Sequence, residues 1–418
     1  MPAAAPRIAV VGAGWAGLAC AVGATRAGAQ VTLYESARSA GGRARSVPTD
    51  DWLLDNGQHI LIGAYTETLG LMRIVGADPD ALLMRLPLSL RFADGGGLAL
   101  PRGAASLALL RGIAQARGWS WRDKLTLLRT ALAWRLRGFR CDSALTVAGL
   151  CEGLPARVMQ DLIDPLCVSA LNTPTTRASA AVFLRVLRDA LLGPVGASDL
   201  LLPRADLDAL FPRPALDWLA QRGATLRRGQ RVQSLVKTGT AWQIDDQPFD
   251  RIVLACPPGE AARLAESIAP AWARLARSLR HEPIATVYAM ADRAVDQPML
   301  ALRCNASQPA QFVFDRGQLG GQSGLLAFVA SAWHGERAAL EAGVVAQARV
   351  QLGLKVRPVS TLIDKRATFA CTPGLQRPPA SAGHGLLACG DYIEGPYPAT
   401  LEGAVRSGLE AAGAALRT

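Results

Sequence analysis

The chain has 418 residues, of which half are hydrophobic and only 19% are charged, and its eight cysteines form neither a C-x-x-C pair nor a metal-like Cys/His spacing. This length and composition favour two interleaved globular domains with a large apolar interior, and they argue against a disulfide-stabilised scaffold or a cysteine-based metal site. The net charge of +11 comes almost entirely from dispersed arginines, and no nucleic-acid-binding module accompanies them.

No window of the sequence reaches the roughly eighteen consecutive apolar residues of a membrane span. Residues 1–7 run directly into an apolar strand, which leaves no room for a signal peptide. We therefore expect a cytoplasmic protein without metal or disulfide, whose thiols at Cys20, Cys256 and Cys389 are buried and free.

The N-terminal stretch RIAVVGAGWAGL (7–18) is an apolar strand, a G-x-G-x-x-G turn and the start of an alanine-rich helix. Gly12 permits the tight turn, Gly14 lets the backbone approach a pyrophosphate, and Gly17 lets the helix pack closely on the strand. The positive end of that helix would hold the phosphate charge. The predicted nucleotide-binding residues of this turn are Gly12, Ala13, Gly14, Trp15, Ala16 and Gly17.

A second predicted strand, 31–35, ends in Glu35 at about the distance from the glycine turn that a ribose-binding carboxylate requires, roughly twenty residues. A carboxylate at this position accepts hydrogen bonds from a ribose diol and repels the 2′-phosphate of NADP. Gly41 and Gly42 then allow a close backbone approach, and Arg43 offers a fork to phosphate oxygens.

The pattern E-x(5)-GGRAR (35–45) and the following DNGQH (55–59) resemble the superfamily of flavin-containing amine oxidases and phytoene desaturases. This resemblance implies FAD as cofactor and an α/β fold, a Rossmann-like FAD-binding domain interleaved with an α+β substrate domain. It also implies that Gly57, Gln58 and His59 lie near the isoalloxazine ring. His59 is therefore a candidate catalytic group, although a lone histidine is more often structural; Tyr65 is the second candidate.

The middle of the chain changes character, because 107–113, 121–136 and 178–192 carry apolar residues at helical spacing. The stretch from Trp121 to Arg140 interleaves aromatic and basic residues. Such a pattern suits peripheral contact with an anionic membrane, but it also suits a cap helix whose charged face is solvated. The sequence favours the cap helix, and peripheral membrane contact stays an open alternative.

The flavin domain is predicted to resume near residue 201, with strands at 231–236 and 241–244. The stretch FDRIVLACPP (249–258) resembles the return strand of the same superfamily, which implies that the backbone of Val232 contacts the adenine. Alternating runs between 281 and 335 predict strands, and 337–354 predicts a helix, so that a second sheet would roof the flavin.

Near the C-terminus, a strand ends in Gly390-Asp391 and a helix begins at Thr400-Leu401. By the same resemblance, Gly390 and Asp391 bind the ribityl–pyrophosphate region. The helix N-terminus at Thr400 and Leu401 points at the flavin O2/N1 edge, where a positive helix end stabilises the reduced flavin. We predict an FAD-binding domain of residues 1–85, 201–280 and 355–418, and a substrate domain of residues 86–200 and 281–354.

Two departures argue against amine oxidation. The chain has no lysine between Lys237 and Lys355 to lie near flavin N5, and Thr400 stands where that family places a cage tyrosine. The chain instead resembles the hydroxysqualene dehydroxylase family over nearly its whole length. The segments that carry this resemblance are DNGQHILIGAY (55–65), PLCVSALNTP (165–174), RATFACTPGLQRP (366–378) and CGDYIEGPYPATLEGAVRSG (389–408).

This resemblance implies the reductive dehydroxylation of hydroxysqualene to squalene in squalene and hopanoid synthesis, by hydride from reduced flavin. The substrate would be an apolar isoprenoid, and the external electron donor is unknown. Two alternatives stay open at this point. One is a carotenoid or phytoene desaturase-like oxidase, and the other is a flavin-binding scaffold of a prenyl-synthase complex.

Overall fold

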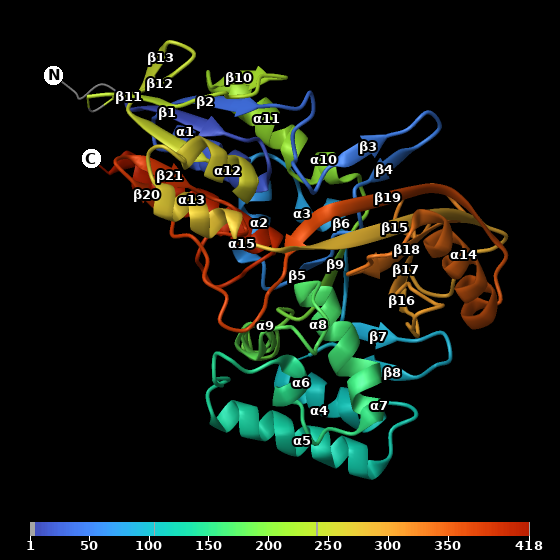
Figure 1. The fold of residues 1–418 in the computed structure, drawn as a ribbon. Coiled ribbons are helices and arrows are strands. Elements are labelled where there is room, and N and C mark those ends of the chain that lie inside the picture. Colours follow the sequence, from blue (N-terminus) through green and yellow to red (C-terminus); the bar gives the residue numbers. More distant parts are fainter. Residues whose placement is uncertain (1–4, 104, 240, 418) are drawn as a thin grey trace.

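The computed structural model describes residues 5–103, 105–239 and 241–417. The first and last parts of the chain, blue and red in Figure 1, lie together at one end of the molecule. The helices of the middle segment form a lobe at the other end, and a second sheet lies beside the junction of the two. The order of the elements is therefore interleaved, as the sequence predicts.

The N-terminal strand stands near the centre of a six-stranded sheet whose order is β10-β2-β1-β14-β21-β20. Neighbouring strands run parallel from β10 to β21, and β20 is antiparallel. The strands span Thr225–Arg228 (β10), Gln30–Glu35 (β2), Arg7–Val11 (β1), Arg251–Leu254 (β14), Leu386–Ala388 (β21) and Ser381–Gly383 (β20). The two termini of the chain thus build one sheet, which agrees with the predicted Rossmann-like domain.

The two faces of this sheet are covered by different layers. Val10 and Val253 pack with helices on one face, whereas Val11 and Leu254 pack with Trp242 on the other, because successive side chains of a strand point to opposite faces. The helices are α1 (Trp15–Arg26), α11 (Pro212–Gln221) and α15 (Leu401–Leu416). The opposite layer is an antiparallel meander of β11 (Val236–Thr238), β12 (Ala241–Ile244) and β13 (Gln247–Phe249).

One predicted strand is wrong. The stretch 231–235 has no regular structure, and the strand begins only at Val236. The edge of the sheet is instead β10, at 225–228, which pairs with β2. The sequence signal is weak here because β10 is exposed or half-buried along its length and shows no apolar alternation.

The second sheet has the order β16-β17-β18-β15-β19 and is antiparallel throughout. Its strands are Met299–Ala301 (β16), Phe312–Asp315 (β17), Leu325–Ser331 (β18), His281–Ala291 (β15) and Val356–Phe369 (β19). The helix α14 (Arg337–Gln347) and the following π-helix η2 (Ala348–Leu352) cover one face. The predicted domain boundary at 355 is wrong in one respect, because β19 pairs along the whole of β15 and belongs to this sheet.

The middle segment forms a helical lobe, which we call the cap. Its elements are α4 (Ala105–Gln115), α5 (Trp121–Leu136), α6 (Val147–Leu150), α7 (Ala156–Val158), η1 (Met159–Ile163), α8 (Asp164–Leu171) and α9 (Ala180–Leu192). Asp161, fully buried in η1, accepts hydrogen bonds from Trp119 and Arg157 and pairs with Arg303, which follows β16. This ion pair ties the cap to the second sheet.

Shorter elements connect these parts. The helices are α2 (Thr66–Ile74), α3 (Pro79–Leu82), α10 (Leu207–Leu210), α12 (Pro258–Ala265) and α13 (Pro270–Arg277). The small sheets are β3 (Ser46–Pro48) with β4 (Leu53–Asp55), β7 (Ser89–Arg91) with β8 (Gly97–Ala99), and β9 (Leu200–Pro203) between β5 (Leu61–Ile62) and β6 (Leu83–Leu86). Within the described ranges, no helix has the length and apolarity to cross a membrane.

Candidate functional site

The glycine turn between β1 and α1 has the close contacts that two of its three glycines predict, Gly12 and Gly17. Gly12 has φ +114°, and a Cβ there would lie 2.7 Å from the carbonyl oxygen of Ala255. A Cβ on Gly17 would lie only 1.9 Å from the carbonyl oxygen of Gly12. Both positions therefore exclude any residue larger than glycine. Gly12 is required for the turn, and Gly17 is required for the close approach of α1 to β1.

The second glycine pair folds onto this turn. The Gly41 amide donates to the Ala13 carbonyl at 2.8 Å, and a Cβ on Gly42 would lie 3.1 Å from the Cα of Gly14. Gly14 is the N-cap of α1 and no side chain caps the helix, so the amides of the first turn, over Trp15 to Gly17, are free to bind an anion. Two motifs about thirty residues apart thus form one backbone-lined site.

The side chains of the turn serve packing. Trp15 and Ala16 are buried, and the Trp15 indole donates to the Ala44 carbonyl at 2.9 Å. Any cofactor contact from these residues is therefore a backbone contact. Cys20, about one turn further along α1, is buried, as are Cys256 and Cys389, in agreement with the predicted burial.

Glu35 ends β2 beside the turn. Its half-buried carboxylate accepts hydrogen bonds from the Ala13 and Ala37 amides, both at 2.8 Å. Ser36 also donates to the oxygen that binds Ala37, so the other oxygen, held against the glycine turn by the Ala13 amide, is the one that retains a lone pair for a ribose hydroxyl.

Arg43 and Asp391 come from opposite ends of the chain and form an ion pair. The other terminal nitrogen of Arg43 donates to the Ala367 carbonyl at 2.7 Å. Asp391 is almost fully buried, whereas Arg43 is half-buried. The structure thus brings two predicted cofactor residues together. Part of the hydrogen-bonding capacity of the Arg43 guanidinium is used within the protein.

The loop 55–59 lies against the second sheet. The Gln58 side chain donates to the Tyr288 hydroxyl at 2.8 Å and accepts from Arg316 at 3.2 Å. Gly57 has φ +87°, which lets the loop reverse direction. Tyr288 and Arg316 were not predicted as site residues, and only the alternation along β15 indicates the inward direction of Tyr288.

His59 is held in its neutral form. Burial lowers its pKa, as does the positive charge of Arg43, although a hydrogen bond to the Asn56 carbonyl acts in the opposite direction. Its Nε2 lies 3.1 Å from that carbonyl oxygen and donates to it in the neutral tautomer. This arrangement favours a positioning role for His59 over proton donation.

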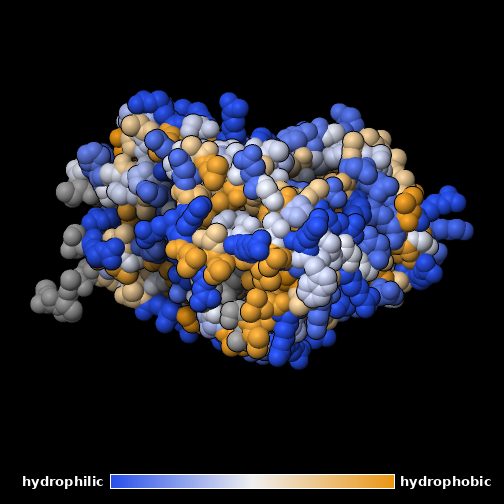
Figure 2. Space-filling model, turned by 90° about the horizontal axis from the view of Figure 1, so that it is seen from below, coloured by the Kyte–Doolittle hydropathy of each residue, from blue (hydrophilic) through white to orange (hydrophobic). Residues whose placement is uncertain are grey.

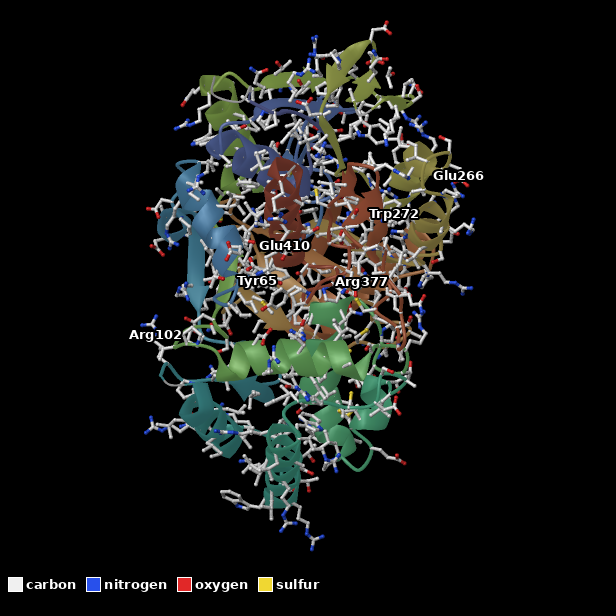
Figure 3. All side chains as sticks on the ribbon, turned by 90° about the vertical axis from the view of Figure 1, so that its left-hand side faces the viewer. Tyr65, Arg102, Glu266, Trp272, Arg377 and Glu410 are labelled. Carbon is white, nitrogen blue, oxygen red and sulfur yellow. The ribbon has the colours of Figure 1, made fainter. Side chains whose placement is uncertain are left out.

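Tyr65, the other candidate, lies at the start of α2 and close to the N-terminus of α15. Burial and the nearby Glu402 carboxylate raise the pKa of its phenol. In Figure 3 the labelled Tyr65 lies between α15 and the cap. Tyr65 and His59 thus have different charged neighbours, Glu402 for Tyr65 and Arg43 for His59.

Val232 follows β10 as a buried residue in an irregular segment. Its carbonyl accepts a hydrogen bond from Arg263 at 2.8 Å, and Arg263 also donates to the neighbouring Gln233 carbonyl. Glu260, one turn earlier in α12, binds Arg263 and Arg231. Arg263, which no sequence motif marks, therefore fixes the backbone at the predicted adenine position.

The C-terminal motif closes the site. Gly390 donates its amide to the Ser407 hydroxyl at 3.1 Å, while Thr400 caps α15 by accepting from the Gly403 amide at 2.9 Å. The amide of Leu401, the first residue of α15, lies in the turn whose amides have no partner within the helix. This helix end is therefore polarised as the prediction requires.

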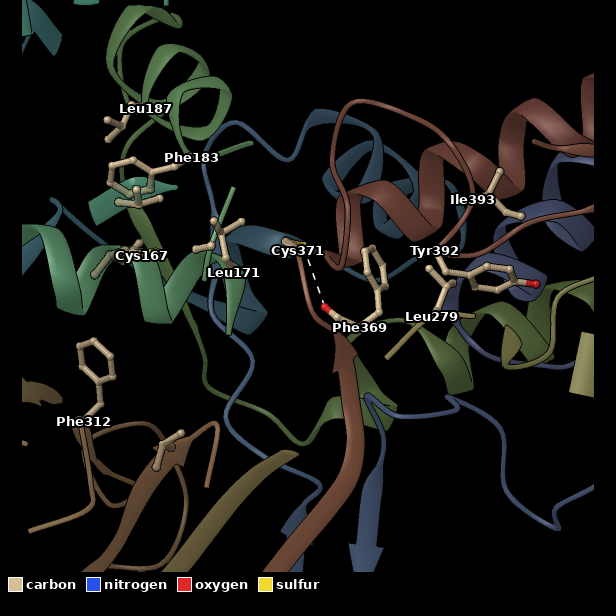
Figure 4. Packing of buried hydrophobic residues seen from close by; sticks show 14 of the residues in the cluster. Cys167, Leu171, Phe183, Leu187, Leu279, Phe312, Phe369, Cys371, Tyr392 and Ile393 are labelled. Atoms are coloured by element: carbon tan, nitrogen blue, oxygen red, sulfur yellow. Dashed lines mark hydrogen bonds between the residues drawn. The ribbon is translucent and has the colours of Figure 1, made fainter. Parts of the chain in front are cut away.

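Tyr392, the residue after Asp391, provides the test of whether FAD fits. Its hydroxyl is buried and has no hydrogen-bond partner in the described structure. Figure 4 shows the ring at the edge of an apolar cluster, with the hydroxyl directed away from Phe369. A buried donor without a partner beside Asp391, together with the free amides of α1, fits a bound polar group such as a dinucleotide.

Two surface pockets lie away from these residues. One, of about 330 Å³, is lined by α9 and the segment 138–141. The other, of about 320 Å³, is lined by Leu88, Leu100, Ala108 and Val195 among others, and we call it the cap pocket. None of the residues that line them is among those predicted to bind FAD. Within the described ranges, no group of three or more His, Cys, Asp or Glu side chains is placed so that it could hold a metal ion.

Some known proteins are similar to this chain over nearly its whole length. It is 27% identical to the hydroxysqualene dehydroxylase of Sinorhizobium fredii, with 97% of each chain covered, and 27% identical to that of Rhodopseudomonas palustris, with 96% of each covered. A zeta-carotene desaturase of a Synechocystis species is 43% identical, but over only 18% of this chain and 16% of its own. The predicted resemblance to hydroxysqualene dehydroxylases is thus confirmed.

Solved structures show the same fold at low sequence identity. A putrescine oxidase bound to putrescine superposes with a TM-score of 0.67 at 15% identity, covering 98% of both chains. The cyclohexylamine oxidase of Brevibacterium oxydans superposes with a TM-score of 0.64 at 15% identity, covering 99% of both. Residues 15–416 match the family described as flavin containing amine oxidoreductase. The chain therefore belongs to this family, which confirms the predicted fold and the prediction of an FAD-dependent oxidoreductase.

Proposed function

We propose that this enzyme catalyses the reductive dehydroxylation of hydroxysqualene to squalene, in squalene and hopanoid biosynthesis. The observation that carries the proposal is the similarity to hydroxysqualene dehydroxylases over 96–97% of the chain, cap included. The desaturase matches, by contrast, cover less than a fifth of the chain. The cap, which the sequence predicts to be part of the substrate domain, lies within this similarity.

The reaction exchanges a C–O bond for a C–H bond. The hydride would come from bound FAD in its reduced form, a proton would complete the departing hydroxyl as water, and an external donor would have to reduce the flavin again. The allylic carbon becomes electron-poor as the hydroxyl leaves, and water would recapture it. The protein must therefore supply an apolar chamber and hold the one polar group of the substrate.

An apolar environment for the substrate is supported by the hydrophobic cluster between the cap and the second sheet. Figure 4 shows labelled members running from Phe183 and Leu171 of the cap to Phe369 and Tyr392, with Phe312 of β17 to one side. All five side chains are buried. This cluster joins the cap to Tyr392, beside the predicted flavin site.

One face of the second sheet points to this cluster. Along β15, Ala285, Val287 and Ala289 pack beneath α14, so Thr286 and Tyr288 face the opposite side. Tyr288 reaches the loop 55–59 from that side, because its hydroxyl donates to the Asp55 carbonyl at 2.8 Å and accepts from Gln58. The face that carries Thr286 is therefore the face beside the predicted flavin ring.

The surroundings of Thr286 support a role for its side chain in binding the hydroxyl group of the substrate. Its side chain is 1% exposed and its hydroxyl has no hydrogen-bond partner within the described residues. Its neighbours across the strands, Val329 and Leu362, are apolar. A buried hydroxyl among apolar side chains costs free energy unless it is paired, and an alcohol group would pair with it. We propose that the Thr286 hydroxyl forms a hydrogen bond with the hydroxyl of the substrate.

The desaturase-like oxidation is the second candidate, and it is favoured by the short matches to carotenoid desaturases. Its substrate is equally apolar but has no hydroxyl to be bound by Thr286. Amine oxidation is disfavoured by the absence of a lysine between Lys237 and Lys355. We further propose that the protein is cytoplasmic and contacts the membrane peripherally, since its substrate is a membrane-soluble lipid.

The test is an anaerobic single turnover. The purified holoenzyme is reduced chemically and mixed with hydroxysqualene, and we expect reoxidation of the flavin with an equal amount of squalene formed. Squalene itself, which lacks the hydroxyl, is the matched control and should leave the flavin reduced. If the reduced flavin persists while the oxidised enzyme desaturates a polyene, the desaturase assignment replaces this one. If the holoenzyme does neither, the enzyme assignment fails and a scaffold role replaces it.

A further inference from the structure

The cap carries an apolar surface that the chemistry above does not require. Seven of the eleven large hydrophobic side chains that are exposed in the described residues lie on it. They are 47–79% exposed and belong to α4, α5 and the loop after α9: Leu107, Leu110, Trp121, Leu125, Leu132, Leu136 and Val195. We call this set the cap surface. Exposed apolar groups scattered singly are ordinary, but a concentration on one lobe marks a contact site.

The helix α5 shows how this surface is built. Trp121, Leu125, Leu132 and Leu136 are spaced so that they share one side of the helix, whereas Leu127 and Trp134 are buried on the other. A capping box between Ser120 and Asp123 fixes its first turn. The helix is therefore apolar on the side that packs against the cap and also on a side that faces outward.

Basic residues accompany the apolar ones. The segment 102–140 contains nine arginines and lysines and a single acidic residue, Asp123, whose carboxylate is used in the capping box. Arg122, Arg129 and Arg135 are exposed on α5. In Figure 2, which looks at the molecule from the cap side, apolar side chains gather within a hydrophilic border, and Figure 3 shows Arg102 projecting outward from the edge of the cap.

We propose that the cap surface docks on an anionic lipid bilayer. Long arginine side chains can place their charge at lipid headgroups while their stems and the neighbouring leucines enter the interface. The strong positive charge of the segment favours anionic over zwitterionic lipid. A protein partner would need acidic groups to match the same arginines, whereas an anionic bilayer matches both the charge and the apolar area.

The cap pocket lies beside this surface. Ala108 of α4 and Val195 both line it, so it is bordered by the α4 and Val195 parts of the cap surface. The Asp199 and Ala197 carbonyls accept hydrogen bonds from Gly63 and Ala64, which continue the chain from the loop 55–59. Docking in this orientation places a pocket at the lipid surface, one loop away from the predicted flavin site. This part of the inference rests on the proposed function, because only a lipid substrate gives such a pocket a use.

The test is sedimentation of the holoenzyme with vesicles. With vesicles of phosphatidylglycerol and phosphatidylcholine at low salt, we expect the protein to pellet, and with phosphatidylcholine alone, or at 1 M salt, to remain in solution, since salt screens the attraction. The variant Arg129→Glu/Leu132→Ser should lose at least tenfold in vesicle affinity. Its matched control, Arg349→Glu/Val350→Ser, changes a neighbouring exposed basic and apolar pair on η2, outside the cap surface, and should bind as the unchanged protein does.

Several results would overturn the proposal: equal binding to both kinds of vesicle, equal loss in the control variant, or self-association in solution that the cap variant abolishes, which would make the surface an interface between copies. Because the cap variant could misfold, its flavin absorbance and thermal unfolding are compared with those of the control. A second measurement uses Trp121→Phe, which should remove part of the fluorescence quenching by brominated lipid; unchanged quenching contradicts docking through α5.

Vesicle binding needs no turnover, so its failure and the failure of the proposed reaction are separate results. If both hold, the cap variant should turn over hydroxysqualene in detergent micelles at the normal rate and should be at least tenfold slower with substrate presented in anionic vesicles. An equal slowing in micelles contradicts docking as its cause.

Discussion

At the scale of single residues, Gly17 of the first turn is one of the positions at which the structure leaves no room for a side chain. A Cβ on Gly17 would lie 1.9 Å from the Gly12 carbonyl oxygen, a separation that no side chain can adopt, so α1 would have to move away from β1. The free amides of α1 would then lose their alignment with a bound pyrophosphate.

We predict that Gly17→Ala lowers the FAD content of the purified protein to less than about a tenth, because even a methyl group displaces the helix that binds the phosphates. The flavin absorbance relative to protein measures this. The control is Gly70→Ala in α2, where a Cβ meets nothing within 4 Å. A normal flavin content in Gly17→Ala would contradict the role of the turn.

Thr286 is the second residue at which the structure adds to the sequence. We predict that Thr286→Val, which removes a hydroxyl at nearly constant shape, lowers kcat/KM for hydroxysqualene about tenfold, the worth of roughly one hydrogen bond. The flavin content and the rate of chemical flavin reduction should not change. Thr286→Ser keeps the hydroxyl and should recover most of the activity, whereas equal loss in both variants would indicate a packing role.

At the scale of elements, the sequence predicted most helices and strands, and missed the ones that lack a periodic apolar pattern. The four strands expected between 281 and 335 and the helix that follows are present, because alternation or helical spacing is strong in each. The irregular segment at 231–235 was predicted as a strand, because its composition resembles one. What holds it is a set of side chains on α12, and no local pattern reports such a contact.

The helix α12 allows a prediction at this scale. Hydrogen bonds from Arg263, and secondly from Arg231, outweigh partial burial and hold the pKa of Glu260 at about 2. A carboxyl group whose pKa is lower in the folded state stabilises the fold above its ordinary pKa and loses this contribution as the pH falls towards the folded value. The stabilisation is thus present at pH 7 and disappears between about pH 4.5 and 2.

We predict that Glu260→Gln reduces the free energy of unfolding by about 1–2 kcal/mol at pH 7, a value discounted for partial exposure, and that the loss shrinks as the pH is lowered towards 3. The affinity for FAD should also fall several-fold, since Arg263 then holds the Val232 carbonyl less firmly. Urea unfolding and FAD titration measure the two effects. Glu266→Gln, which breaks an exposed pair with Arg277, should change neither.

At the scale of the whole molecule, ion pairs on buried carboxylates join the cap to the second sheet: Arg303 pairs with Asp161, and Arg177 pairs with Glu282. Asp161 has no exposed area, and Arg303 reaches it while also pairing with Asp94 at 3.1 Å. The Arg303 guanidinium additionally lies 3.6 Å from the centroid of the Phe92 ring. Removing one partner of a buried ion pair leaves the other without compensation.

We predict that Arg303→Met destabilises the cap by about 2–4 kcal/mol and leaves the flavin content unchanged, because the cofactor domain is not involved. Hydrogen exchange should then accelerate in the helices of residues 105–192 and remain slow in β1, β14 and β21. Arg277→Met is the control for losing a solvent-exposed ion pair. Uniform acceleration over the whole chain would show that the two parts unfold together.

The sequence by itself predicted a dinucleotide site at the glycine turn with Glu35 as its ribose-binding carboxylate, and its resemblance to flavin-containing amine oxidases implied FAD and the remaining residues proposed to bind it. The first of these predictions follows from short-range requirements: glycines where backbones meet, and a carboxylate at the end of a strand that follows at a fixed distance. Each is a local rule, and each therefore leaves a pattern in the chain. The predicted contacts of Gly12, Gly17 and Gly42 are of this kind.

Only the tertiary structure decided what depends on distant segments. It paired Arg43 with Asp391, across nearly the whole chain, and it placed β19 beside β15. It also left the hydroxyls of Tyr392 and Thr286 buried without partners, and it gathered the apolar and basic residues of the cap on one surface. None of these follows from spacing, because whether a side chain is paired, buried or exposed depends on which other segments pack against it.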